Sequence, residues 1–384
     1  MSLEVFITCS EAKQVSEFKK FLKLHGAKPL EPGECRQDNW WVEFKKCLKH
    51  LNICWKDDNI GDNDVNDVLN SVASLVIQLP PPQRDEIIDF LCEQYLDFTD
   101  GNLKKHRPKL FSLNLIFHGL HPESPCKCKI YVTMVACAEK LDMLSQIITD
   151  PKKVSSWLSR CRCSIAERQQ VWRKLYDAHS LLNESRRATE ALVCLLSTYT
   201  EATATEARQD AIKCIISVIQ DPSLLAYDQL SALKPIQFLE GEPVHDFFKI
   251  FLSGNLNTFE EFLSAHPDFL NQNGLNKTSC QHKLRMLTLM QLCENQTELS
   301  YHSAAENLDL SVEELEPFII EAVRQRAVAC KLDQIQKRIL ITGSFPRTFG
   351  RPQWVNLRET LIQWRTGLET VQNSIGSMVM AEVN

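Results

Sequence analysis

The sequence predicts a mainly α-helical protein, in which an α-solenoid of stacked antiparallel helices leads into a winged-helix subdomain and then into a long carboxy-terminal helix. From about residue 10 to 270, apolar residues recur with the helical period of about 3.6 residues, between short polar or proline-containing breaks. Residues 277–342 then show three helical segments followed by two segments of alternating apolar residues, which is the order of a winged helix. The last thirty residues carry one continuous apolar stripe at helical spacing.

The composition fits a soluble globular chain. Hydrophobic residues make up 44% of the 384 positions and charged residues 24%, so the chain can bury a substantial core. The net charge of −6 offers no general attraction to nucleic acid or to an anionic membrane. The amino terminus lacks the basic and apolar regions of a signal peptide, and no apolar run approaches the ~18 residues of a membrane span. We therefore expect a cytoplasmic protein with no membrane partner.

The sequence contains no recognisable catalytic or nucleotide-binding motif. Only 12 glycines occur and no two of them are separated by a single residue, which excludes the dinucleotide-binding G-x-G-x-x-G motif. The P-loop, the G-x-S-x-G motif of serine hydrolases and the H-E-x-x-H motif of zinc proteases are absent as well. We therefore expect no enzymatic activity and no cofactor.

Fifteen cysteines are scattered through segments with helical patterning, and several lie on apolar faces, as Cys137 does. This pattern predicts reduced thiols in the core. Two C-x-C pairs, Cys126/Cys128 and Cys161/Cys163, suggest metal binding, but structural zinc sites use C-x2-C or longer spacings with a matching second pair. The spacing therefore argues against a metal site.

The solenoid is expected in two parts. Residues 1–175 form an amino-terminal region of helical repeats, and residues 176–276 form helices that adjoin the winged helix. No strict sequence period emerges, so the sequence supports no named repeat. The connections between apolar segments are short, which favours antiparallel helix pairs that each need a neighbour on either side.

The winged helix is expected over residues 277–345. Its first helix spans residues 277–293. Two further helices open at Ser303 and Ser311, each followed three residues later by a glutamate, which is the spacing of a capping box. An apolar run at 328–332, a polar turn and a second apolar run at 339–342 predict a two-stranded hairpin.

The charge of the third helix argues against DNA. In a winged helix this element enters the DNA groove, but here it carries four glutamates against two arginines, a net charge of −2. Phosphates would repel it, so we expect no sequence-specific DNA binding.

The wing and its exit are basic. Five cations against one aspartate give this part a net charge of +4. A nucleic-acid-binding winged helix, or weak RNA contact, is the alternative to an ordinary solvent-exposed hairpin. The five basic residues are Lys331, Lys337, Arg338, Arg347 and Arg351.

The terminal helix, over residues 346–384, carries an apolar stripe that is called the seam below. Because Gly367 and Gly376 weaken the helix, its stability depends on packing against something that covers the stripe. The flanking positions show no alternating charges that specify a homodimeric coiled coil, which favours a bundle with helices of other chains. Folding back onto the chain's own domain is the alternative. The seam consists of Trp354, Leu357, Leu361, Trp364, Leu368, Val371, Ile375 and Met378.

A helical array, a winged helix and a long terminal helix in this order resemble the PCI-domain proteins, the family named for the proteasome lid, the signalosome and initiation factor three. The similarity is densest in LSALKPIQFLEGEPVHDFFKIFLSGNL (residues 230–256) and AVACKLDQIQKRILITGSFPRTFGRPQW (residues 327–354). The resemblance implies that the helices and the winged helix together form a PCI domain. It also implies a non-catalytic scaffold subunit of the eukaryotic initiation factor three complex, which supports pre-initiation complex assembly on the small ribosomal subunit and mRNA recruitment.

The resemblance further implies where partners bind. PCI domains of this family sit side by side through their winged helices, so Ile339, Leu340 and Ile341 of the second wing strand match the lateral contact, and the edge of this strand is expected to accept strand pairing. The seam matches the helix that joins a multi-subunit bundle. The expected partners are other PCI subunits of the initiation factor complex and the small ribosomal subunit. A subunit of the signalosome, which regulates cullin deneddylation, is the alternative within the family, and one chain can also serve both complexes.

Overall fold

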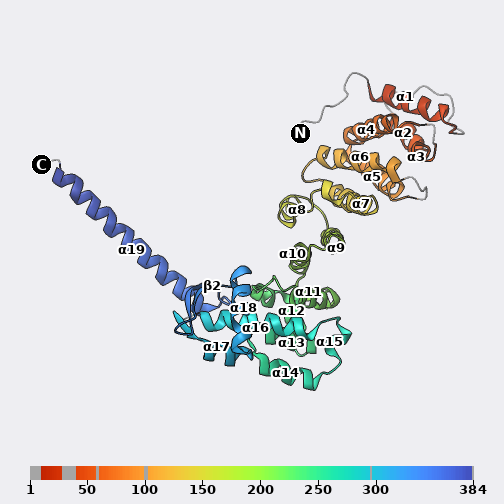
Figure 1. Cartoon of the computed structure of the whole chain (residues 1–384). Helices are drawn as coiled ribbons and strands as arrows, with labels where there is room; N and C mark the ends of the chain where they lie inside the picture. Colours follow the sequence, from red (N-terminus) through yellow and green to blue (C-terminus); the bar gives the residue numbers. More distant parts are fainter. Residues whose placement is uncertain (1–9, 28–39, 58–59, 99–102, 295, 383–384) are drawn as a thin grey trace. The chain divides into compact units, whose positions relative to one another are not determined.

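The computed structural model describes residues 10–27, 40–57, 60–98, 103–294 and 296–382, and within them the side chains up to residue 375 except that of residue 104. The chain divides into two units, Met1–Thr198 and Tyr199–Asn384 (Figure 1). Both are built mainly from helices, and the predicted mainly α-helical fold is confirmed. None of the helices described combines the length and the apolar character needed to cross a lipid bilayer.

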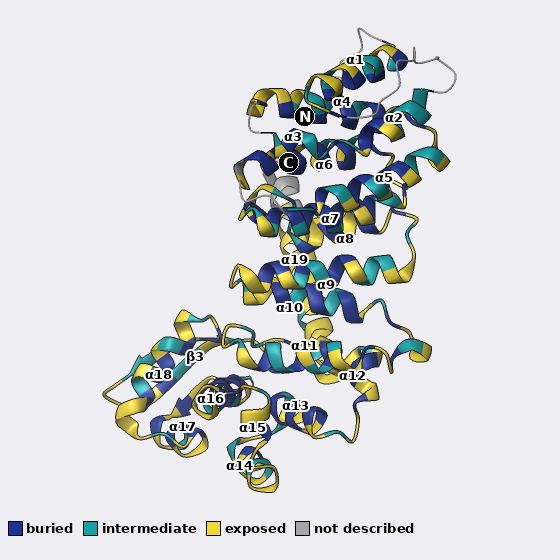
Figure 2. Ribbon diagram, turned by 90° about the vertical axis from the view of Figure 1, so that its right-hand side faces the viewer, coloured by how far each residue is buried: buried dark blue, intermediate teal, exposed yellow. Residues whose placement is uncertain are grey.

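Unit 1 is a stack of antiparallel helices, as the short connections predict. Helix α4 packs on α5 and α6, α6 packs on α7, α7 on α9, and α9 on α10. Buried residues line the faces on which these helices meet, and exposed residues cover the other faces (Figure 2). The elements are α1 (Glu11–Leu24), α2 (Trp40–Leu48), α3 (Ile53–Lys56), α4 (Asp62–Gln78), α5 (Pro81–Tyr95), η1 (Leu103–His106), α6 (Arg107–Gly119), α7 (Cys126–Lys140), η2 (Leu144–Gln146), α8 (Pro151–Leu158), α9 (Ile165–Leu181) and α10 (Ser185–Leu196).

Unit 2 begins with further helices and continues through the winged helix into the terminal helix. The division predicted between residues 175 and 176 would fall inside α9 of unit 1, and it remains a prediction. The elements are η3 (Glu201–Thr203), α11 (Arg208–Gln220), η4 (Asp228–Ala232), α12 (Lys234–Phe238), α13 (Pro243–Ser253), α14 (Leu256–Ala265), α15 (Phe269–Gln272), α16 (Lys277–Cys293), β1 (Glu298–Ser300), α17 (Tyr301–Leu308), α18 (Val312–Arg324), β2 (Val328–Asp333), β3 (Arg338–Ser344) and α19 (Arg351–Glu382).

An aromatic cluster forms the core of the helical part of unit 2. The ring of Phe247 on α13 lies 5.3 Å from Phe251, 5.2 Å from Phe262 and 4.9 Å from Phe269, measured between ring centroids. These separations are those of attractive tilted and edge-to-face ring pairs. The cluster therefore joins α13, α14 and α15 into one support beside α16.

The winged helix contains α16, α17, α18 and a sheet of three strands in the order β1-β3-β2, with antiparallel neighbours. The sequence predicts only a two-stranded hairpin, and the structure adds a third strand, β1. Leu299 of β1 pairs with Ile339 of β3. The predicted start of α17 at Ser303 is also wrong. The cap is Ser300, whose Oγ accepts the N–H of Ser303 at 3.2 Å, because the chain turns directly from β1 into the helix. The capping box of α18 at Ser311 is confirmed.

Candidate protein-interaction surfaces

The seam lies on α19 and no other described residues cover it. Its seven described side chains, from Trp354 to Ile375, are each between 41% and 70% exposed. Met378 lies within α19, but its side chain falls outside the described residues. Two flanking residues, Val355 and Ile362, are also exposed and widen the apolar face. The described part of the chain thus does not fold back onto the seam, and this apolar surface is available to another chain.

Arg347 fixes the base of α19 to the helical part of unit 2. Its side chain is only 5% exposed, and the guanidinium donates to the carbonyl oxygens of Ile250, Phe251 and Gly254 at 2.8 to 3.1 Å. These carbonyls lie at the carboxy-terminal end of α13, where the last C=O groups of a helix need partners from outside the helix. The carbonyl of Ile250 also accepts the N–H of Gly254, and that of Phe251 also accepts the O–H of Tyr227. The prediction that Arg347 contacts RNA is therefore wrong, because its donors are engaged inside the protein.

Two further contacts hold the start of α19. The backbone N–H of Phe349 donates to Oδ2 of Asp228 at 2.7 Å, and Nε2 of Gln353 donates to Oε1 of Glu294 at 2.7 Å. The ring of Phe349 meets that of Trp354, the first seam residue, edge to face at 4.9 Å. The first turn of α19 is thus anchored, while the seam beyond it is exposed.

The three residues matched to the lateral contact lie in β3, the central strand of the sheet. Ile339 is fully buried, and Leu340 and Ile341 are half-buried. Leu340 pairs with Glu298 of β1 on one side and with Lys331 of β2 on the other. The prediction of a free strand edge at these residues is therefore wrong, because β1 and β2 occupy both edges. Because successive strand residues point to opposite faces of the sheet, the half-buried side chains of Leu340 and Ile341 lie on opposite faces.

Helix α18 presents an apolar face that the sequence prediction missed. Val312, Ile320 and Val323 are exposed, and their spacings of eight and three residues place them on the same side of the helix. The spacing of these three apolar residues is present in the sequence and is the signal that predicts this face. An exposed apolar face together with a net negative charge suits a protein partner better than a DNA groove.

Four of the five basic residues of the wing and its exit are exposed. They are Lys331, Lys337, Arg338 and Arg351. Arg338 is ion-paired, with Nη1 2.9 Å from Oε2 of Glu298 on β1. Contact of this patch with RNA remains a prediction.

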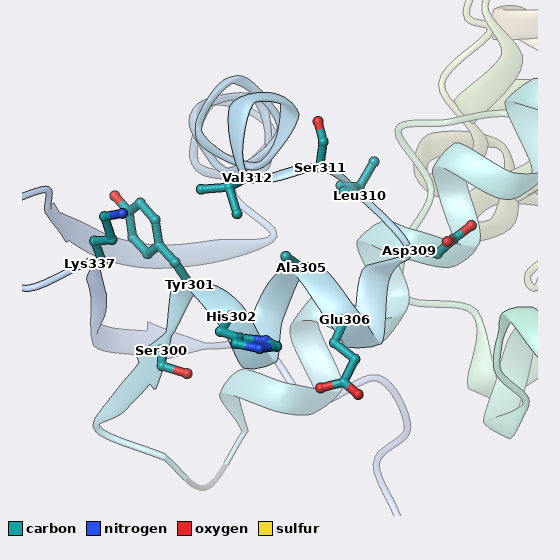
Figure 3. Close-up of a pocket in the computed structure, with 10 residues that line it drawn as sticks. All are labelled: Ser300, Tyr301, His302, Ala305, Glu306, Asp309, Leu310, Ser311, Val312 and Lys337. Atoms are coloured by element: carbon teal, nitrogen blue, oxygen red, sulfur yellow. The ribbon is translucent and has the colours of Figure 1, made fainter.

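A hollow of about 890 Å³ lies between α17 and the start of α18 (Figure 3). Figure 3 shows Lys337 beside Tyr301 at one end of it and Asp309 at the other. Its two capping hydroxyls are already used, since Ser300 accepts the N–H of Ser303 and Ser311 donates to Glu314 at 2.9 Å. Both hydroxyls therefore serve as helix caps. The lining residues are Ser300, Tyr301, His302, Ala305, Glu306, Asp309, Leu310, Ser311, Val312 and Lys337.

Comparisons with known proteins agree with this architecture. Residues 262–343 match the PCI domain family, and residues 347–375 match the family described as eIF3 subunit M, C-terminal helix. The second match covers Arg347 and every seam residue except Met378. The predicted PCI domain and the separate terminal helix are therefore both confirmed.

Relatives extend the similarity over the whole chain. The eukaryotic translation initiation factor 3 subunit M of Schistosoma japonicum is 62% identical over 100% of both chains. The proteins of the same name from Xenopus tropicalis and Homo sapiens are 35% and 34% identical, over 98% of this chain and 99% of their own lengths. The resemblance of residues 230–256 and 327–354 is to this same subunit. Since such identities extend over nearly the full length, the chain belongs to the family of eukaryotic translation initiation factor 3 subunit M.

Proposed function

We propose that this chain is a non-catalytic scaffold subunit of the initiation factor 3 complex. In this role it holds other PCI subunits in place, supports assembly of the pre-initiation complex on the small ribosomal subunit, and thereby assists mRNA recruitment. We propose that this assembly takes place in the cytoplasm. The exposed seam of α19 is the single observation that carries the proposal.

The energetics of the seam support a partner of several helices. Fully burying one such side chain contributes on the order of 1.5–3 kcal/mol, and the seven described side chains are all at least 41% exposed. Apolar residues also flank the stripe at Val355 and Ile362, so the apolar face is wider than a two-stranded coiled coil requires. A bundle that covers α19 from more than one side suits this width.

The winged helix supports a second, lateral contact. Leu340 and Ile341 are half-buried on β3, and Val312, Ile320 and Val323 are exposed on α18. These apolar side chains belong to the same subdomain and are separate from the seam along the chain. We propose that the winged helix binds a neighbouring PCI subunit while α19 enters the bundle.

Neither a signalosome subunit nor a nucleic-acid-binding winged helix is favoured. The relatives described above are named as subunits of initiation factor 3, which gives a signalosome role no support of its own. The four glutamates of α18 disfavour a nucleic-acid-binding winged helix. The basic patch of the wing is also smaller than the sequence predicts, because Arg347 is buried.

The proposal is tested by affinity purification of the tagged full-length chain from a eukaryotic lysate, with a mass-spectrometric inventory of its partners. Other initiation factor 3 subunits and proteins of the small ribosomal subunit are the expected partners. The triple variant Leu361→Ala, Trp364→Ala and Leu368→Ala should lose most of them, because truncating central anchors removes the largest contributions to binding. Cullins and a deneddylating metalloprotease in place of ribosomal proteins would support the signalosome instead.

A matched control distinguishes loss of the seam from loss of any exposed apolar side chains. Ile165 and Leu181 lie at the two ends of α9 and are both 58% exposed. The double variant Ile165→Ala and Leu181→Ala should keep its partners. Equal loss in both variants would contradict a specific role of the seam.

A further inference from the structure

Three cysteine sulfurs lie together in unit 1. Cys128 belongs to the first turn of α7, and Cys161 and Cys163 lie in the segment that joins α8 to α9. Their Sγ atoms are all within 4.8 Å of one another, and those of Cys128 and Cys161 are 3.8 Å apart. The cluster contains both cysteines of the Cys161/Cys163 pair and only Cys128 of the Cys126/Cys128 pair. The remaining cysteine, Cys126, donates its S–H to Oδ1 of Asp85 at 3.0 Å instead.

The segment that carries two of these thiols is held on both sides. The N–H of Arg162 donates to the carbonyl oxygen of Glu123 at 3.1 Å, just before α7. Cys161 donates its S–H to the carbonyl oxygen of Ser124 at 2.9 Å, and Nη2 of Arg168 on α9 donates to the carbonyl oxygen of Cys161 at 3.3 Å. These contacts hold the α8–α9 segment beside α7 and α9 without a metal.

The sulfur separations fit a metal ion. A tetrahedral zinc with Zn–S bonds of about 2.3 Å places its sulfur ligands ~3.8 Å apart, which is the separation of Cys128 and Cys161. The largest separation within the cluster, at most 4.8 Å, needs a closure of ~1 Å to reach this value. Thiolates are the ligands that zinc and other soft metal ions prefer. We propose that Cys128, Cys161 and Cys163 bind a thiophilic metal ion of the Zn²⁺ type.

The surroundings suit the charge of such a site. When the ion binds, three S–H protons pass to solvent and three metal–sulfur bonds form, so Zn²⁺ with three thiolates carries one net negative charge. Lys127, which is only 9% exposed, lies next to Cys128 in the chain and acts electrostatically on Cys161. Its ammonium group compensates the negative charge. Cys163 is only half-buried, which leaves a path for the ion and a fourth position for water.

A nearby buried hydroxyl also lacks a partner. The Oγ of Ser124 is inaccessible to solvent and makes no hydrogen bond, although the carbonyl oxygen of the same residue accepts the S–H of Cys161. Ligands of metal ions are commonly held and tuned by hydrogen bonds from such neighbours. The metal would tie the α8–α9 connection to α7 and so stabilise this part of unit 1.

The test uses the full-length chain, purified under reducing conditions with a chelator and then titrated with Zn²⁺ against a chromophoric competitor. We expect one equivalent to bind with a dissociation constant below about 1 µM. X-ray absorption at the zinc edge should show three sulfur neighbours at about 2.3 Å. Binding should also raise the unfolding temperature, because the ion binds the folded state.

The variants Cys163→Ser and Cys161→Ser should weaken binding at least about a hundredfold and abolish the rise in unfolding temperature, with circular dichroism confirming that each variant is folded. Cys126→Ser and Cys194→Ser, which alter half-buried cysteines outside the cluster, serve as matched controls and should bind like the unaltered chain. Absent or weak binding, or binding that folded Cys163→Ser retains, would overturn the proposal and leave the three thiols as packing groups of the core.

Discussion

The guanidinium of Arg347 donates twice to the carbonyl oxygen of Phe251, from Nε at 3.1 Å and from Nη2 at 2.9 Å. The two residues are 96 positions apart in the chain. Phe251 also belongs to the aromatic cluster around Phe247, so the bond connects the base of α19 to the core of the helical part. Together with the contacts of Phe349 and Gln353, it fixes the start of the helix that carries the seam. The Arg347 contacts therefore fix the position of the base of α19 on the helical part of unit 2.

Arg347→Met should loosen this anchor. The variant loses five hydrogen bonds of a buried, charged donor, four to backbone carbonyls and one to Gln291, at a cost of about 3 kcal/mol in local stability. Amide hydrogen exchange in peptides covering residues 243–256 and 347–356 should then accelerate about a hundredfold where exchange follows the opening equilibrium. Arg351→Met, which removes an exposed arginine four residues later, is the control and should change little. Unchanged exchange in Arg347→Met would show that α19 is held by its other contacts.

The helix caps of the winged helix can be tested by substitution. The structure places the cap of α17 at Ser300, whereas the sequence spacing predicts Ser303. Ser300→Ala and Ser311→Ala should each lower the free energy of unfolding by about 1 kcal/mol, because each loses a cap bond to a backbone N–H. Ser303→Ala, at the residue with the capping-box spacing, should cost less than about 0.5 kcal/mol. Urea denaturation monitored at the winged helix measures all three. A larger loss at Ser303 than at Ser300 would contradict the observed start of α17.

Local signals made most of the winged helix predictable. Helix α16 begins and ends at the predicted residues, and Ser311 caps α18 through a bond between neighbours in the chain. The error at α17 has a non-local cause. Residues 298–300 form a strand only because β3 pairs with them about forty positions later, and so short a strand shows no alternation of its own.

The same distinction applies to the candidate sites. The seam was predictable because a single helix carries it, and its period is present in the sequence alone. Charge alone predicts RNA contact for Arg347, because its partners lie 56 to 97 residues away and leave no local pattern. The thiol cluster joins Cys128 to Cys161 across 33 positions, so the spacing within each C-x-C pair contained no information about it.

Leu340→Asp should weaken a lateral PCI neighbour more than it weakens the bundle. A carboxylate on β3 would have to be desolvated when a partner covers it, which costs several kcal/mol unless it is paired. Quantitative mass spectrometry of purified complexes should show selective loss of one neighbouring subunit, while subunits bound through α19 are retained.

The control for this prediction is Ile335→Asp. Ile335 is 96% exposed in the turn between β2 and β3, so an aspartate there adds the same charge to the wing outside the proposed contact. It should leave both sets of partners in place. If Leu340→Asp instead removes bundle and lateral partners equally, the two surfaces do not act separately.

Lys283 gives unit 2 a pH dependence that can be isolated. Its ammonium nitrogen, on α16, donates to the carbonyl oxygens of Val218 and Asp221 at the end of α11. Burial lowers the pKa of Lys283 to about 7, against about 10.4 in an unfolded chain. Between these values the folded lysine has lost its proton while the unfolded one keeps it. The unfolded state therefore binds more protons, and this group makes the free energy of unfolding rise with pH.

Lys283→Met should remove this contribution. The free energy of unfolding of the unaltered chain minus that of the variant should increase from pH 7 to pH 9, by at most about 1.4 kcal/mol per pH unit. Taking the difference cancels the ionisation of the cysteines, which changes stability in the same pH range. Urea denaturation at several pH values measures it, with Lys213→Met, an exposed lysine on α11, as the control. A difference that stays constant across this range would show that Lys283 keeps its proton in the folded protein, held by the two carbonyls.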